Sequence, residues 1–241
     1  MNTIQKPKFG LTNNQLKIIA MVSMLLDHVG LVLFPDVMIF RYIGRLAFPI
    51  FAYMIAEGCR YTKNRAKYLG MIAGMAVIFQ AVYFVAMQSL YQGILVTFSL
   101  AIITIYSIDG ILHAKKFWGR LAGIGALAFV ATFVFVLPLL LTGTDFDLDY
   151  GAWGILLPII VYFAPKHAWR VGGTAVLLLI RAIHYAFWGV PMQWWSLVSV
   201  PLLALYNEKR GRAKMKYVFY IFYPVHLVII YGIAILIELL K

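Results

Sequence analysis

The chain has 241 residues, of which 63% are hydrophobic and only 12% are charged. Its mean hydropathy of +0.86 lies well outside the soluble globular range, so the sequence predicts a polytopic membrane protein. The formal net charge is +12, and the single cysteine, Cys59, excludes an internal disulfide framework, a thiolate zinc cluster and a cysteine redox pair.

The first apolar segment, residues 16–34, is long enough to cross a bilayer as a helix and carries Asp27 and His28 side by side near its middle. Ionisable groups at that depth are costly, and they mark proton relays, ion paths or catalytic sites. Lys17 precedes His28 by eleven residues, so both lie on nearly the same stripe of the helix, roughly 16 Å apart. The acid and the histidine indicate a retained span rather than a cleavable signal peptide.

Hydropathy along the chain predicts an all-α fold, a polytopic transmembrane helical bundle that forms one domain over residues 1–241. Two of the predicted spans are short, and they contain Pro158 and Pro201, so either could be broken or re-entrant. The count is therefore about nine, with a range of seven to nine. The predicted spans are 16–34, 40–59, 68–87, 94–112, 119–141, 152–164, 171–188, 192–206 and 217–240.

The basic residues divide unevenly between the two sets of loops. If the spans alternate in direction, 17 of the 21 Lys and Arg residues lie at one set of ends, and the opposite loops contain none. The positive-inside rule then predicts a cytoplasmic N-terminus and an external C-terminus. The charge is thus a topology signal, and we expect no nucleic-acid partner. The 17 residues are Lys6, Lys8, Lys17, Arg60, Lys63, Arg65, Lys67, Lys115, Lys116, Arg120, Lys166, Arg170, Lys209, Arg210, Arg212, Lys214 and Lys216.

Three arginines fall inside predicted spans. Arg41 lies near the external end of the second span, where it can snorkel to the headgroups, and Arg45 lies a turn deeper on the same face. Arg181 and His184 are three residues apart and share a helix face, and His226 lies near mid-depth in the last span. We expect the buried ionisable groups to converge between the midplane and the external face: Asp27, His28, Arg45, Arg181, His184 and His226.

A histidine beside a carboxylate can act as a general base, which makes His28 the first candidate for chemistry. Neighbours on a helix point about 100° apart, so Asp27 either orients His28 or neutralises Arg45. His184 and His226 are candidates for a supporting role, or for interhelical hydrogen bonds. The spacing matches no helical zinc motif, and we expect no metal site.

Two loop regions bear on binding. In the external loop, Asp145, Asp147 and Asp149 alternate, an arrangement that could attract a cationic acceptor or a divalent ion. We favour the alternative, a solvated acidic loop. The basic clusters at 60–67 and 209–216 serve topology first, and a second role on the phosphates of a nucleotide-like donor stays open.

Four separated segments resemble the TraX family over about Leu11 to Leu227. They read LTNNQLKIIAMVSMLLDHVG, YIGRLAFPIFAYMIAEGCRYTKNRAKYL, LDYGAWGILLPIIVYF and ALYNEKRGRAKMKYVFYIFYPVHL. The family's named member is associated with acetylation of the pilin amino terminus in conjugation, and the family resembles the larger group of multi-spanning membrane acyltransferases. In that group a basic residue and a histidine with ten residues between them handle donor and transfer. Lys17 and His28 have this spacing, with Lys in place of the more usual Arg.

The resemblance implies a membrane-embedded acetyltransferase of the bacterial inner membrane, with acetyl-CoA as co-substrate. The acceptor would be a protein amine such as the pilin N-terminus, a glycan hydroxyl or a small molecule. The catalytic candidates are His28, Asp27 and Arg45. The donor-binding candidates are Lys17, Arg60, Lys63 and Arg65. The candidates near the substrate or behind the site are Arg181, His184, His226, Tyr223, Asp149 and Tyr150.

Two rival functions remain open at this point. A proton-coupled transporter or flippase would also bury Asp, His and Arg at mid-depth, but it predicts paired repeats, which are not visible in the sequence. An assembly factor without chemistry would not need buried ionisable residues.

Overall fold

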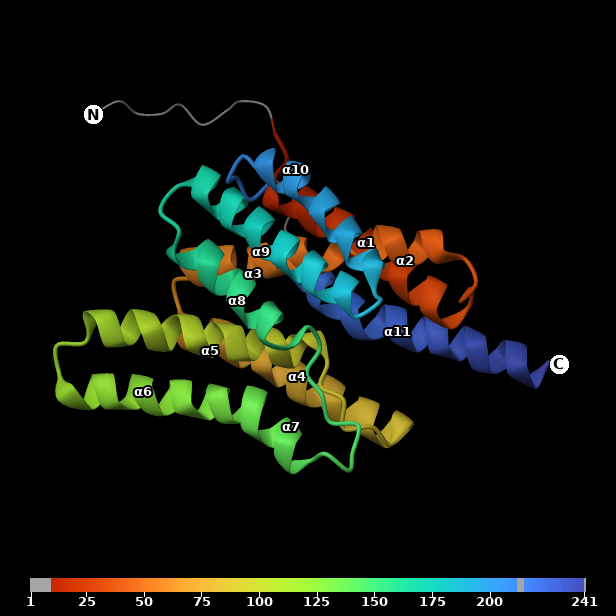
Figure 1. The fold of residues 1–241 in the computed structure, drawn as a ribbon, viewed down its shortest axis with the longest axis horizontal. Coiled ribbons are helices and arrows are strands. Elements are labelled where there is room, and N and C mark those ends of the chain that lie inside the picture. Colours follow the sequence, from red (N-terminus) through yellow and green to blue (C-terminus); the bar gives the residue numbers. More distant parts are fainter. Residues whose placement is uncertain (1–9, 212–214, 241) are drawn as a thin grey trace. The chain divides into compact units, whose positions relative to one another are not determined.

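The computed structural model describes residues 10–211 and 215–240, and its regular elements there are helices (Figure 1), which confirms the all-α prediction. Of the 21 Lys and Arg residues, Lys6, Lys8, Arg212, Lys214 and Lys241 lie outside the described residues. The α-helices are α1 (Asn13–Val32), α2 (Met38–Gly44), α3 (Ala47–Tyr61), α4 (Arg65–Met87), α5 (Ile94–His113), α6 (Phe117–Ala131), α7 (Leu137–Leu140), α8 (Gly151–Phe163), α9 (His167–Phe187), α10 (Ser199–Ala204) and α11 (Lys216–Leu239); η1 (Thr132–Val136) is a π-helix and η2 (Pro191–Val198) a 3-10 helix.

Within the described chain, seven helical segments are long and apolar enough to cross a membrane. Seven is the lower end of the predicted range. The two short predicted spans account for the difference: residues 152–164 form the shorter helix α8, and residues 192–206 form η2 followed by α10. The second predicted span is also interrupted, because turns at residues 45–46 separate α2 from α3.

The chain divides into two compact units. Unit 1 comprises Met1–Met54 and Lys166–Lys241, and unit 2 comprises Ile55–Pro165. The single domain over residues 1–241 stays a prediction.

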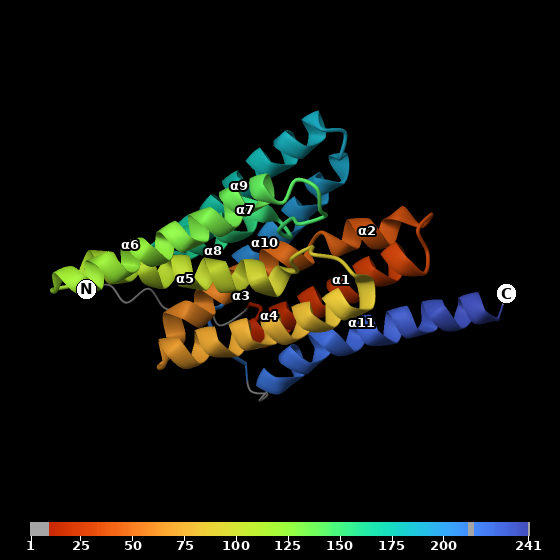
Figure 2. The same ribbon diagram turned by 90° about the horizontal axis from the view of Figure 1, so that it is seen from below.

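In unit 1, α1 packs against α2 and α11, and α9 packs against η2 and α10. Figures 1 and 2 both show α11 running alongside α1. Helix α1 begins with a capping box: the Gln15 amide donates to the Thr12 hydroxyl, and the Thr12 amide donates to the Gln15 side chain.

The segment after α10 holds the start of α1. The Asn13 amide donates to the Lys209 carbonyl at 2.8 Å, and the Asn14 amide donates to the Arg210 carbonyl at 3.2 Å. These are amides of the first helical turn, which have no partner inside the helix itself. Residues 209 and 210 are therefore held at the N-terminal end of α1, the end that carries Lys17.

In unit 2, α5 is the central helix and packs against α4, α6 and α8. Figure 1 shows α5 and α6 side by side. A core cluster of Leu100, Ala101, Val130, Leu148 and Ile155 joins α5 to α6, α8 and the loop before α8. Gly123 and Gly154 allow the close approach, since a Cβ on either would overlap Ile111 or Thr97 respectively.

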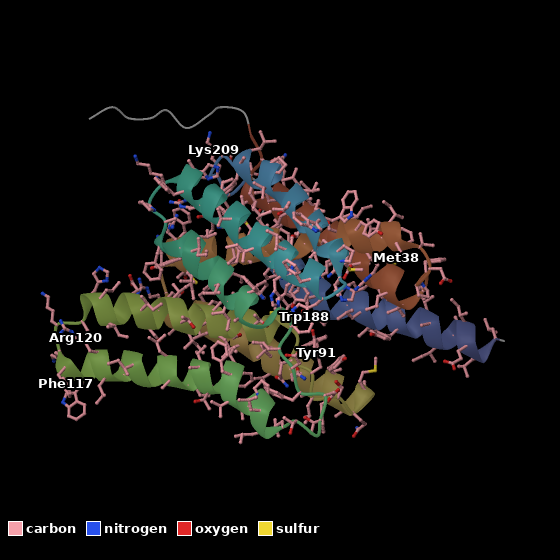
Figure 3. The ribbon with its side chains drawn as sticks, viewed as in Figure 1. Met38, Tyr91, Phe117, Arg120, Trp188 and Lys209 are labelled. Atoms are coloured by element: carbon pink, nitrogen blue, oxygen red, sulfur yellow. The ribbon has the colours of Figure 1, made fainter. Side chains whose placement is uncertain are left out.

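The ends of each unit agree with the alternation predicted from charge. Figure 3 shows Lys209 at one end of unit 1 and Met38 and Trp188, which adjoin predicted external loops, at the other. In unit 2 it shows Phe117 and Arg120 at one end and Tyr91 at the other. Which set of ends faces the cytoplasm stays a prediction.

Candidate active site

The α1–α2 hairpin depends on two glycines at its closest approach. A Cβ on Gly30 would lie 2.5 Å from the Cβ of Phe40, and a Cβ on Gly44 would overlap the carboxylate of Asp27. Real Cβ atoms do not come that close to other atoms, so only glycine lets the two helices meet here. The Asp27 carboxylate is consequently pressed against α2.

Asp27 is shared by two guanidinium groups. Its Oδ1 accepts from Arg45 Nη2 at 2.7 Å, and its Oδ2 pairs with Arg41 Nη1 at 3.0 Å. Of the two roles left open for Asp27, the structure shows the pairing with Arg45. The structure places Arg41 on Asp27, where it also donates to the Asp27 carbonyl at 3.3 Å, and snorkelling of Arg41 to the headgroups stays a prediction.

His28 contacts His226 across the α1–α11 interface. Nε2 of His226 lies 3.3 Å from Nδ1 of His28, and the rings meet edge to face with centroids 5.0 Å apart. Nδ1 of His28 is also 2.9 Å from the Met24 carbonyl, and Nδ1 of His226 is 2.8 Å from the Phe222 carbonyl. A carbonyl oxygen can only accept, so in each neutral ring the hydrogen is on Nδ1.

This tautomer assignment fixes the direction of the contact between the rings. The Nδ1–H of His28 is shared between the Met24 carbonyl and Nε2 of His226, which acts as an acceptor. The Nε2 lone pair of His28 is then its proton-accepting atom. His226 is buried, stacked on Phe222 at 4.7 Å, and meets Tyr223 edge to face at 6.0 Å.

Lys17 lies on the same helix as His28, near its N-terminal end, and is half-buried. Its Nζ sits 5.1 Å from the centre of the Phe219 ring, a cation–π contact with α11. The hydrogen bond from the Asn14 amide to the Arg210 carbonyl holds Arg210 at this same end of α1.

Arg181 and His184 belong to unit 1, as His28 and His226 do, but they contact other residues of that unit. Arg181 is buried, donates to the Gln193 side chain at 2.7 Å and faces the rings of Phe48 and Tyr185. His184 is exposed and meets Tyr185 edge to face. Arg181 thus ties α9 to η2 and to the start of α3.

Three of the predicted donor-binding residues belong to unit 2, at the turn between α3 and α4. Arg60 donates to the carbonyls of Val161, Tyr162 and Ala164, which close the C-terminal end of α8. Arg65 pairs with Asp109 at 2.6 Å, and Lys63 is exposed. The two arginines therefore have structural partners within unit 2.

Asp149 and Tyr150 also belong to unit 2. The Tyr91 hydroxyl donates to Asp149 Oδ1 at 3.1 Å, and burial, together with this carboxylate, raises the pKa of Tyr91. Tyr150 precedes α8 with a left-handed backbone, φ +60°. Asp145 accepts from the Leu90 amide at 2.9 Å, and hydrogen bonds from Ser89 and Leu90 lower its pKa. The acidic loop is thus tied to the residues before α5.

The buried histidine site lies in unit 1 and combines Asp27, His28, Arg45 and His226 with Arg41. Sequence reasoning missed the place of Arg41; its position four residues before Arg45, on the same helix face, was the available signal. It also missed the hydrogen bond from Tyr53 to Nδ1 of His167, at 3.1 Å, which joins α3 to α9. In the described part of the chain, no three His, Cys, Asp or Glu side chains gather as a metal site requires.

Two comparisons with known proteins give matches that span nearly the whole chain: one is to a family model and the other is to an individual protein. The family model described as "TraX protein" matches residues 12–234. A probable fimbrial assembly protein FimC, serogroup H1, of Dichelobacter nodosus is 25% identical over 243 residues, covering 90% of this chain and 93% of that protein.

A second relative is similar over a short segment. The uncharacterized protein RP591 of Rickettsia prowazekii (strain Madrid E) is 48% identical over 44 residues, which is 17% of this chain and 18% of that protein. No solved structure matches the chain.

Proposed function

The chain belongs to the TraX family, and from this membership together with the buried histidine site we propose that it is a membrane-embedded acetyltransferase. The proposed reaction moves an acetyl group from acetyl-CoA to an amine or hydroxyl acceptor, and the proposed location is the bacterial inner membrane. The observation that carries the proposal is the state of the His28 ring. Its Nδ1–H is held by the Met24 carbonyl, so the Nε2 lone pair serves as a base within an apolar helix.

In the proposed reaction, Nε2 of His28 accepts the proton of the acceptor while the acceptor's nitrogen or oxygen attacks the thioester carbonyl carbon. The carbon–sulfur bond then breaks, and the proton passes to the leaving thiolate, giving a free thiol and the acetylated acceptor. Arg45, which Asp27 holds at 2.7 Å, is assigned to the negative charge that develops on the carbonyl oxygen. The apolar helices around His28 limit hydrolysis of the thioester by excluding water.

We assign the donor phosphates to Lys17 together with Lys209 and Arg210. The contacts that support this choice are the hydrogen bonds that hold residues 209 and 210 at the start of α1. Arg60 and Arg65 are weaker choices, since their guanidinium groups bind the carbonyls at the end of α8 and the Asp109 carboxylate. Lys and Arg bind phosphate through charge-assisted hydrogen bonds.

Two likenesses support a pilus subunit amine as the acceptor class. The named member of the TraX family is associated with acetylation of the pilin amino terminus, and the Dichelobacter nodosus relative is named as a probable fimbrial assembly protein. A protein N-terminus that emerges at the membrane is the acceptor we propose to test first.

The experiment compares His28→Gln with His28→Ala in purified protein supplied with labelled acetyl-CoA and a pilin N-terminal peptide. Glutamine keeps a hydrogen bond but takes up no proton at neutral pH, so both variants should bind donor and lose transfer by roughly 10²-fold or more. A helix-packing histidine predicts tolerance of Gln and a loss of stability with Ala. Wild-type turnover in folded His28→Gln would refute the catalytic assignment.

A proton-coupled transporter is the second candidate, and the hydrogen-bonded pair of His28 and His226 favours it, since paired histidines inside a bundle can also conduct protons. Proteoliposomes with an internal pH dye distinguish the two. Transfer of label without dye response supports the enzyme, and dye response without transfer supports the transporter.

A further inference from the structure

The contact between the two histidines has a defined donor and acceptor. Because Nδ1 of His226 donates to the Phe222 carbonyl at 2.8 Å, its Nε2 carries a lone pair, and that lone pair faces the Nδ1–H of His28 at 3.3 Å. Phe222 stacks on the His226 ring with an interplanar angle of 6°, which fixes the ring plane. The second histidine thus stands where a carboxylate stands behind the histidine of a hydrolase triad.

The charges around the two rings differ. Next to His28 in the chain is Asp27, which pairs with the guanidinium groups of Arg41 and Arg45, whereas His226 is buried and contacts the rings of His28, Phe222 and Tyr223. A positive charge on His28 is repelled by the two arginines as well as attracted by the acid.

Resting on the proposed acetyl transfer, we propose that His226 is a positioning residue that acts through His28, aligning its ring and holding its Nδ1 proton during the reaction. When Nε2 of His28 takes the acceptor's proton, the Nδ1 proton moves to Nε2 of His226. His28 is then neutral with hydrogen on Nε2, and His226 carries the positive charge. When the thiolate takes the Nε2 proton of His28, His226 returns its proton to Nδ1, and both rings regain their starting state.

The competing explanation of this contact is a structural hydrogen bond that joins α1 to α11 and carries no proton. Replacement by glutamine separates the two uses, because Gln can accept the Nδ1–H bond but cannot bind a proton. The relay predicts that His226→Gln lowers kcat by roughly 10- to 100-fold with little change in the KM for acetyl-CoA. The hydrogen bond alone predicts normal kcat.

The experiment that tests the relay uses the purified full-length protein in detergent, with His113→Gln as the matched control. His113 is an exposed histidine on α5, and its replacement should leave transfer unchanged. In His226→Ala, added imidazole should restore part of the lost transfer by occupying the vacated space, whereas the same imidazole should not affect His226→Gln. Wild-type kcat in folded His226→Gln, or no response of His226→Ala to imidazole, would overturn the relay.

A readout without turnover keeps this proposal distinct from the enzyme proposal. Nitrogen-15 NMR spectra of histidine-labelled protein should show that His28 is protonated at Nδ1 and that His226 is unprotonated at Nε2. The chemical shift of His28 Nδ1 should change in His226→Gln. If wild-type protein transfers no acetyl group but gives these signals, the acetyltransferase proposal is refuted, while the hydrogen bond between His28 and His226 is confirmed. If wild type transfers label and the His28 signal is unchanged in His226→Gln, the pair proposal fails alone.

Discussion

Asp27 is held between the guanidinium groups of Arg41 and Arg45, and this pairing sets the charge next to His28. The set is partly buried, so removing one partner leaves the remaining charge incompletely compensated and destabilises the fold. The acid therefore has two consequences at once: it anchors α2 on α1, and it fixes Arg45 beside the proposed base.

Replacing Lys17 tests whether this residue binds the phosphates of acetyl-CoA. Lys17→Ala should weaken acetyl-CoA binding by about tenfold, the scale of one lost charge-assisted phosphate contact, while Lys17→Arg should keep most of the affinity. Added salt should weaken wild-type binding as well. Isothermal calorimetry in detergent measures all three, and Lys116→Ala is the matched control because it removes an exposed lysine before α6. Equal affinity for wild type and Lys17→Ala would remove Lys17 from the donor site.

At the scale of elements, the pairing of α1 with α2 decides whether the site exists. Gly44 ends α2 where the Asp27 carboxylate lies, and the turn at residues 45–46 that follows redirects the chain into α3. Arg41 lies in α2, and Arg45, four positions later, directly follows the last residue of that helix; both side chains reach the Asp27 carboxylate.

Gly44→Ala tests this arrangement. The added methyl group would overlap Asp27, so we expect a loss of about 1–3 kcal/mol in the free energy of unfolding and a fall in acetyl transfer. Gly74→Ala is the matched control: Gly74 lies within α4 with open space at its Cβ position, so alanine should be neutral or stabilise the helix by up to about 1 kcal/mol. Denaturant unfolding in detergent measures both. A Gly44→Ala protein as stable and active as wild type would contradict the close approach.

At the scale of the whole molecule, the orientation across the membrane determines which side supplies the donor. We predict that residue 143 is outside and residue 209 is in the cytoplasm. With the buried Cys59 replaced by alanine, Gly143→Cys should react with an impermeant thiol reagent added to intact cells, and Lys209→Cys should react only after lysis. Position 209 is preferable to the nearby Gly211, whose φ of +90° disfavours a side chain. Labelling of position 209 in intact cells would reverse the topology and the donor side.

The sequence by itself determined the helical membrane class, the range of span counts and the likeness to the TraX family, because hydropathy and residue spacing are local properties of the chain. It also singled out Asp27 and His28, since an ionisable pair inside an apolar segment is conspicuous without any partner.

Only the tertiary structure decided which side chains pair with one another. Asp27 meets Arg45, eighteen residues away, because two glycines let α1 and α2 touch, and His28 meets His226, 198 residues away, because α11 packs beside α1. Residues 192–206 form η2 and α10 in place of a full span. Hydropathy cannot anticipate these outcomes, since close approach depends on shape at both surfaces and on hydrogen bonds between segments far apart in the chain.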